Sequence, residues 1–293
     1  MSDHIDLSNR TKLRLSGADR LRYLNGQVSN QVQKATSEAA IYACVTTAKG
    51  KMEADVFIAP IPDEDAFLID GPPELREELM MRLDRYIIAD DCELEDVTDD
   101  FELVHVLGNN PPRLEGAWLR AANRIGTEAV DLIAPKGTDL AGKLGSKAAD
   151  PDRIEELRIA NGIAKWGTEL SSEVLPQEAR LQDRAIDFQK GCYVGQEMIS
   201  RIKSAGRVKQ ELVTLAATAE GKSASIQTGA ELQADGEKII GRVTSAVYSA
   251  ILGRWIALGF VRREHLEIGT QLKVSCPENN HASVLEISDF SGM

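Results

Sequence analysis

The sequence has 293 residues, of which 43% are hydrophobic and 27% are charged, as is ordinary for a soluble globular protein of two or three domains. Lysine and arginine number 34 against 46 aspartate and glutamate residues, so the formal net charge is −12. This charge disfavours non-specific binding to nucleic acid, which depends on neutralising phosphates, and we expect no direct nucleic-acid partner. No apolar run is long enough to span a bilayer and the polar start is unlike a signal peptide, so we expect a cytoplasmic protein with no membrane partner.

Two amphipathic helices are expected in the first half of the chain. After Ser16, a candidate cap, apolar residues recur at helical spacing, and a core face is predicted from Leu21, Leu24 and Val28. Gly26 interrupts this helix and indicates close packing, a nearby ligand or a plain helix end. A second helix follows Gly71-Pro72-Pro73, with three leucines on one face: Leu75, Leu79 and Leu83.

The other segments of the first half favour β-strands. A hairpin is expected from residues 40–47 and 52–59, with Gly50 at its bend. Further strands are expected at residues 12–15, 66–70, 91–97, 101–107, 118–125 and 129–134. His105 has no second ligand at metal-binding spacing and is interpreted as a packed or edge histidine. Strands and helices in this order predict α+β layers rather than a regular βαβ series.

The second half begins with a helix and ends in strands. Asp150 is a cap followed by Pro151 at the first helical position, and Asn161-Gly162 ends the helix. Three apolar residues give its predicted buried face: Ile154, Leu157 and Ala160. From residue 211 onward the pattern becomes all-β and predicts a small barrel or sandwich. Its expected strands span residues 212–217, 238–248, 254–261, 271–275 and 283–287.

The four cysteines are scattered singly, without a C-x-x-C pair, at Cys44, Cys92, Cys192 and Cys276. This spacing indicates neither a disulfide framework nor a zinc site. Four thiols from such distant segments would also form an unusual iron-sulfur cage. We therefore expect no metal site, and no conventional cluster held by this chain alone.

One of these cysteines lies in the stretch that carries most of the candidate chemistry, residues 189–197, which reads QKGCYVGQE and opens a predicted helix. Gly191 and Gly195 permit tight bends or close approach to a ligand, because they lack a Cβ. Cys192 lies ahead of the helix N-terminus and near Lys190, and both features favour a thiolate. Free cysteines are more often packed in cores, but the polar, glycine-rich surroundings here favour a functional loop.

Residues 190–197 resemble the K-G-C-[YF]-x-G-Q-E signature of the YgfZ-type folate-binding proteins, which belong to the glycine cleavage T-protein superfamily and are implicated in iron-sulfur cluster assembly or repair. Supporting blocks lie at residues 21–30, 49–52 and 175–181. The resemblance implies a tetrahydrofolate-binding protein that assists iron-sulfur enzymes, with an indirect effect on tRNA modification. Its partners would be folate and iron-sulfur enzymes or cluster carriers, and Cys192 would be the key functional residue.

The resemblance also implies a folate site around this signature. The expected contacts come from Lys190, Gly191, Tyr193, Gly195, Gln196, Glu197, Glu178, Asp55 and Arg201. Asp55 has a competing interpretation as a solvated strand residue, and Glu178 as a plain helix or turn carboxylate. Arg201 begins a basic run with Lys203, Arg207 and Lys209, which either attracts the glutamate tail of a folate or forms a solvated helix face.

Two positions depart from the T-protein pattern. Ala54 stands where the T-protein motif G-G-x-x-D-D has its catalytic aspartate, which counts against glycine-cleavage activity. Ala160 replaces a glutamate that binds the pterin ring, so pterin recognition is expected to differ or be weaker. The rival interpretation is a folate-dependent aminomethyltransferase or demethylase of the T-protein type. Direct action on tRNA is a third, disfavoured by the net charge.

The resemblance implies an architecture of two intertwined T-protein-like α+β domains in a ring with a C-terminal all-β barrel. The first domain would be split, with residues 1–47 joined to residues 150–206. The second domain would span residues 48–149 and the barrel residues 207–293. The sequence pattern alone places boundaries only at the two ends of the 150–206 segment.

Overall fold

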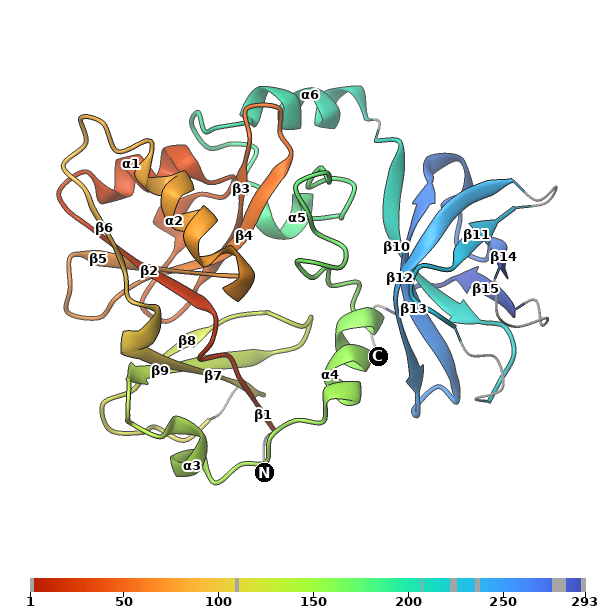
Figure 1. The fold of residues 1–293 in the computed structure, drawn as a ribbon, viewed down its shortest axis with the longest axis horizontal. Helices are drawn as coiled ribbons and strands as arrows, with labels where there is room; N and C mark the ends of the chain where they lie inside the picture. The colour runs from red at the N-terminus through yellow and green to blue at the C-terminus, as the bar shows by residue number, and fades with distance from the viewer. Residues whose placement is uncertain are drawn as a thin grey trace. The chain divides into compact units, whose positions relative to one another are not determined.

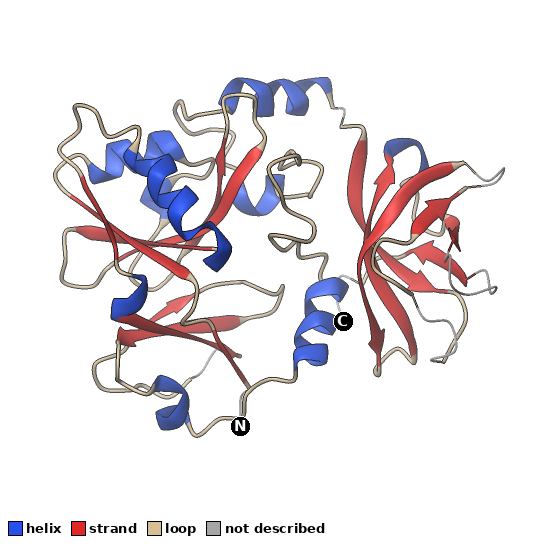
Figure 2. Ribbon diagram, viewed as in Figure 1, coloured by secondary structure: helices blue, strands red, loops and turns tan. Residues whose placement is uncertain are grey.

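The computed structural model describes residues 3–108, 111–206, 208–221, 226–234, 238–275 and 283–290. Its fold is α+β, with two open sheets and a closed barrel (Figures 1 and 2), as expected from the sequence. The chain forms two compact units. Unit 1 contains residues 1–149, 171–176 and 181–201, and unit 2 contains residues 150–170, 177–180 and 202–293.

The larger sheet of unit 1 has five antiparallel strands in the order β3-β4-β5-β2-β6. Their bounds are Ile41–Thr46 for β3, Met52–Pro60 for β4, Ala66–Gly71 for β5, Thr11–Ser16 for β2 and Glu93–Asp96 for β6. The predicted hairpin is confirmed, because β3 pairs with β4 and Gly50 has a φ of +75° at the bend.

The two faces of this sheet bury different kinds of side chain. Helices α1, Arg20–Gln27, and α2, Arg76–Asp84, belong to unit 1 (Figure 1), and both contribute to the apolar core on one face. That core includes Leu13, Leu15, Leu24, Val45, Ala54, Val56, Ile58, Ile69, Leu79 and Leu83. Because side chains alternate along a strand, the opposite face carries Tyr42, Asp55 and Asp70.

Helix α1 differs from its prediction at the start. Ser16 is the last residue of β2, and the position before the helix is Asp19, whose side chain makes no capping hydrogen bond. Leu21 is 36% exposed, whereas Leu24 and Val28 are fully buried. The predicted core face was wrong at Leu21 because the buried stripe of the helix runs through Tyr23, Leu24 and Gln27.

The second sheet of unit 1 has four antiparallel strands in the order β1-β7-β9-β8. Their bounds are His4–Asp6 for β1, Phe101–Leu107 for β7, Ala129–Pro135 for β9 and Trp118–Ala121 for β8. Strand β1 is missing from the predicted elements, because three residues are too short to show a periodic pattern. His105 is fully buried in β7, which confirms that it is a packed histidine.

A buried ionic cluster joins the two sheets. Asp70 of β5 accepts hydrogen bonds from Arg120 at 2.7 Å and from Arg124 at 2.6 Å. Asp131 of β9 accepts from Arg120 at 3.2 Å and from Arg124 at 2.7 Å, and lies 2.8 Å from Nδ1 of His105. Burial alone would raise the pKa of Asp131, but Arg124, His105 and Arg120 together hold it well below its usual range.

Unit 2 contains a closed barrel whose strands follow the order β10-β13-β12-β11-β14-β15. Their bounds are Gln210–Ala217 for β10, Glu231–Gln233 for β11, Ile239–Ser249 for β12, Arg254–Arg262 for β13, Gln271–Ser275 for β14 and Ser283–Ile287 for β15. The predicted strands at 271–275 and 283–287 are confirmed. The three-residue strand β11 is not predicted by the sequence, for the same reason as β1.

Helix α4, Pro151–Ala160, packs against β12 and β13 of the barrel, and the Asp150 side chain caps it by accepting from the Asp152 amide at 2.9 Å. Its predicted apolar face was wrong, because the buried residues of the helix are Glu156, Arg158 and Ile159. Serine hydroxyls on β12 explain the difference. Ser245 accepts from Arg158 at 2.6 Å, and Ser249 donates to Glu156.

The remaining helices are short connections except for α6. The α-helices are α3, Leu140–Leu144, α5, Gln182–Ala185, and α6, Gln196–Ala205. The 3₁₀ turns are Val32–Lys34, Pro73–Leu75, Thr98–Asp100 and Arg263–His265. Helix α6 begins at Gln196, inside the signature, as predicted.

Candidate functional site

The signature segment of residues 190–197 is fastened to two other parts of unit 1. The Val194 amide donates to the Gly26 carbonyl at 3.1 Å, and the Thr46 hydroxyl donates to the Val194 carbonyl at 2.7 Å. Gly195 has a φ of +89°, and a Cβ there would lie 2.5 Å from Oγ1 of Thr46 and 2.6 Å from the carbonyl oxygen of Thr47. Position 195 therefore accepts only glycine. The structure thus brings together the signature, the end of α1 and the β3–β4 hairpin.

Lys190 is buried beneath the signature loop. Its Nζ donates to the carbonyl oxygens of Asn25 at 2.7 Å, Val28 at 2.6 Å and Asn30 at 2.7 Å. An ammonium group has three N–H donors, so all of them are used. Burial lowers the pKa of Lys190 to about 7. The sequence suggests that Lys190 favours a thiolate at Cys192, but the structure directs its donors to the 25–30 turn.

Cys192 is exposed, whereas Tyr193 beside it is buried against Ile186 and Ile199. Nζ of Lys190 lies 5.0 Å from the centroid of the Tyr193 ring, within the range of a cation–π contact. Burial raises the pKa of Tyr193 above its ordinary value. The exposed thiol of Cys192 therefore lies, along the sequence, between two buried side chains, those of Lys190 and Tyr193.

The other predicted residues of the signature are nearer the surface. Gly191 and Glu197 are exposed, and a Cβ at Gly191 would meet no atom within 4 Å. The side-chain amide of Gln196 donates to the Lys190 carbonyl at 3.4 Å. Unlike Gly195, Gly191 is not required by local packing.

Asp55 lies on the polar face of β4. The Tyr42 hydroxyl donates to its Oδ2 at 3.1 Å, whereas its Oδ1 is buried and has no hydrogen-bond partner within the described parts of the chain. Burial raises the pKa of Asp55 above its ordinary value. Tyr42 also packs on Phe57, with ring centroids 4.8 Å apart. The structure therefore buries Asp55, which excludes the interpretation of a solvated strand residue.

Arg184 of α5 completes this group of residues. Its guanidinium carbon lies 5.5 Å from the centroid of the Tyr42 ring, and its Nη2 donates to the Asn123 carbonyl at 2.7 Å. Burial lowers the pKa of Arg184, while Tyr42 and Asp55 act in the opposite direction. Sequence reasoning missed both Tyr42 and Arg184. The only available signal is that Arg184 follows closely after the block at residues 175–181.

The structure shows which side of the sheet Ala54 faces. Its methyl group belongs to the apolar core beneath the sheet, whereas the side chain of the next residue, Asp55, reaches the polar face. A carboxylate at position 54 would therefore lie in the apolar core rather than on the polar face. This face presents two carboxylates, Asp55 and Asp70, of which Asp70 is paired with Arg120 and Arg124.

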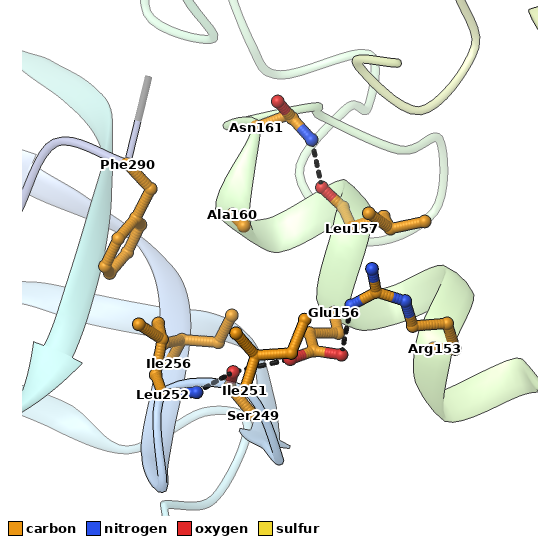
Figure 3. A pocket seen from close by; sticks show the side chains of 10 residues that line it. All are labelled: Arg153, Glu156, Leu157, Ala160, Asn161, Ser249, Ile251, Leu252, Ile256 and Phe290. Atoms are coloured by element: carbon orange, nitrogen blue, oxygen red, sulfur yellow. Dashed lines mark hydrogen bonds and ion pairs between the residues drawn. The ribbon is translucent and has the colours of Figure 1, made fainter. Parts of the chain in front are cut away.

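Glu178 and Ala160 belong to unit 2. Glu178 is 9% exposed, and its backbone carbonyl accepts from the Leu212 amide at 2.7 Å. Ala160 lines a cavity of about 60 Å³ beside α4, shown in Figure 3. The other lining residues are Arg153, Glu156, Leu157, Asn161, Ser249, Ile251, Leu252, Ile256 and Phe290.

The predicted basic run is exposed where it is described. Arg201, Lys203 and Lys209 lie at the surface, and Arg207 lies outside the described residues, as does Cys276. Within the described parts of the chain, no group of three or more histidine, cysteine, aspartate or glutamate residues could hold a metal ion. In the same parts, no helix has the length and apolar character needed to cross a membrane.

Comparison with known families covers most of the chain. Residues 3–117 match the GCVT N-terminal domain, and residues 210–286 match the glycine cleavage T-protein C-terminal barrel domain. The chain belongs to the glycine cleavage T-protein superfamily. The fold agrees, since an aminomethyltransferase T of the glycine cleavage system from Bartonella henselae superposes with a TM-score of 0.84, at 15% identity over 98% of this chain and 84% of its own.

Two kinds of named relative share this superfamily. An iron-sulfur cluster assembly factor IBA57 homolog, mitochondrial, from Mycosarcoma maydis is 28% identical over 71% of this chain. An aminomethyltransferase from Corynebacterium jeikeium is 33% identical over 50% of this chain and 36% of its own length. The chain spans 55% of the assembly factor, just over half. An uncharacterized protein from Haemophilus influenzae is 26% identical over 84% of this chain and 85% of its own length.

Proposed function

We propose that this protein binds a reduced folate in the cytoplasm and assists the assembly or repair of iron-sulfur enzymes, including those that modify tRNA. Cys192 is the residue that acts on the client. The observation that carries the proposal is the exposed thiol of Cys192, held between the buried side chains of Lys190 and Tyr193. The assembly-factor names of several relatives support it, as does the YgfZ-type signature at residues 190–197.

The residues around Asp55 fit a folate. The unpartnered Oδ1 of Asp55 is a buried acceptor, to which the N–H groups of a reduced pterin can donate. Tyr42 and Phe57 add aromatic surface, and Arg184 adds a positive charge beside them. When bound, tetrahydrofolate supplies a carrier for one-carbon groups. Gly191, Tyr193, Gly195, Gln196 and Glu197 remain candidate contacts, together with Glu178 and Arg201. Lys190 is no longer one, because its three donors are used by backbone carbonyls.

A second candidate function is a folate-dependent aminomethyltransferase or demethylase. The observation that favours it is again Asp55, because burial raises the pKa of this carboxyl group and so helps it to hold a proton. In this function Asp55 would exchange a proton with the reacting amine, and Cys192 would have no part in the chemistry.

The two functions differ in what each variant loses. If the protein is an assembly factor, calorimetry detects tetrahydrofolate binding and no aminomethyl donor is turned over. Cys192→Ser then fails to restore iron-sulfur enzyme activity in cells that lack their own factor. For the transferase, an aminomethyl donor is turned over, and this turnover survives Cys192→Ser but is lost in Asp55→Asn. Tight, salt-sensitive binding of tRNA without folate would instead favour direct action on tRNA.

A further inference from the structure

The end of helix α1 is fastened by a cation from far along the chain. The last carbonyl groups of a helix have no partner within it, and positive charge is favoured beside them. Helix α1 ends at Gln27, and Lys190 donates to the carbonyl oxygens of Asn25 in its last turn and of Val28 just beyond it. The same ammonium group reaches Asn30, so it closes the whole 25–30 turn.

The other end of the signature loop is tied to the same turn. The Val194 amide donates to the carbonyl oxygen of Gly26, and the Val194 carbonyl accepts from Thr46. Cys192 thus lies midway between two residues, Lys190 and Val194, that both bind the 25–30 turn. The exposed thiol owes its place to attachments on either side rather than to packing of its own.

Within the described ranges of the chain, Lys190 forms no salt bridge with a carboxylate. Asp187 acts on its charge from outside contact distance and is itself paired with Lys34 at 2.8 Å. The backbone carbonyls and the face of Tyr193 are therefore what receives the ammonium group.

We infer that Lys190 is a positioning residue, which fixes the loop that presents Cys192 by binding the end of α1. The inference rests on the proposed function of Cys192. It concerns how the thiol is held and not what the thiol does.

Hydrogen exchange tests this inference in Lys190→Met, which keeps the side-chain length but removes the donors. The matched control is Lys12→Met, because Lys12 is also buried and donates to two carbonyls, those of Ser8 and Arg10, each at 2.9 Å. In Lys190→Met, amide exchange in residues 189–197 becomes at least tenfold faster, rescue of iron-sulfur enzymes falls to the level of Cys192→Ser, and tetrahydrofolate affinity stays within twofold. Lys12→Met leaves exchange in residues 189–197 and rescue unchanged.

A second variant covers the case in which the methionine variant fails to fold. Lys190→Arg keeps the charge, but a planar guanidinium cannot direct three donors at three converging carbonyls, so exchange in residues 189–197 again rises. Unchanged exchange in the folded Lys190 variant overturns the inference, and so does faster exchange with full rescue. Full rescue by Cys192→Ser instead refutes the proposed function, so the two failures are distinguishable.

Discussion

Asp55 is predicted to lower the stability of the fold, as functional carboxylates often do. Its Oδ1 is buried without a partner and its pKa is raised by burial, so ionisation is less favourable in the folded protein than in the unfolded chain. We expect Asp55→Asn to increase the free energy of unfolding at pH 8 by about 1 kcal/mol, because the amide has no charge to bury.

The sign of this effect fixes its pH dependence. A raised pKa in the folded state means that Asp55 costs stability only where it is ionised, so the cost appears as the pH rises above the unfolded value of 3.8. The advantage of Asp55→Asn should therefore shrink as the pH falls towards 3.8. Urea titrations followed by circular dichroism at several pH values measure it, provided the slopes of the transitions agree.

Asp131→Asn is the matched control for this experiment. Asp131 is equally buried, but its oxygens are fully paired with Arg120, Arg124 and His105. Removing one partner of such a buried cluster costs about 3 kcal/mol or more, so this variant should be destabilised. The reasoning about Asp55 is refuted if Asp55→Asn also loses more than about 1 kcal/mol of stability, or if its advantage does not shrink as the pH falls towards 3.8.

Three further predictions follow from the same contacts. Gly195→Ala should lower the free energy of unfolding, measured by urea titration, by about 3 kcal/mol or more, because the alanine would have a positive φ and its Cβ would overlap the backbone. Gly191→Ala is the control and should change stability little. Equal effects of the two substitutions would contradict this. Between pH 7 and 9, the free energy of unfolding of the wild type should rise by about 2 kcal/mol relative to that of Lys190→Met. The pKa of Lys190 is about 7 in the folded protein and 10.5 in the unfolded chain, so folding releases a proton in this window. A stability difference that does not change with pH would contradict this. Ser249→Ala should cost about 1 to 3 kcal/mol by leaving the buried Glu156 one donor short, measured by thermal unfolding; an unchanged midpoint would contradict it.

The strands were more predictable from the sequence than the helix faces. The β3–β4 hairpin and the barrel strands have period-two patterns and turn residues, which depend on local chemistry. The buried face of α4 was mispredicted because Glu156 and Arg158 find hydroxyl partners on β12, and a hydrophobicity pattern does not contain that information. Short elements such as β1 and β11 gave no signal.

The candidate site was predictable only in its residue types. The signature identified Cys192, Lys190 and Gly195, but the partners of Lys190 lie about 160 residues earlier in the chain, so its contacts with the 25–30 turn could not be inferred. Ala54 and Asp55 differ by one strand position, and that single step decides which of them faces the core. Their roles therefore required the structure.

The most direct test of the central claim is rescue of iron-sulfur enzyme activity by Cys192→Ser in cells lacking the endogenous factor, with tetrahydrofolate affinity measured on the same purified variant. Cys92→Ser is the control, because Cys92 is a half-buried thiol outside the signature that packs against the core of unit 1. We predict that Cys192→Ser binds tetrahydrofolate as wild type does but fails to rescue, while Cys92→Ser does both. Full rescue by Cys192→Ser would show that the thiol is not required, and would contradict the account.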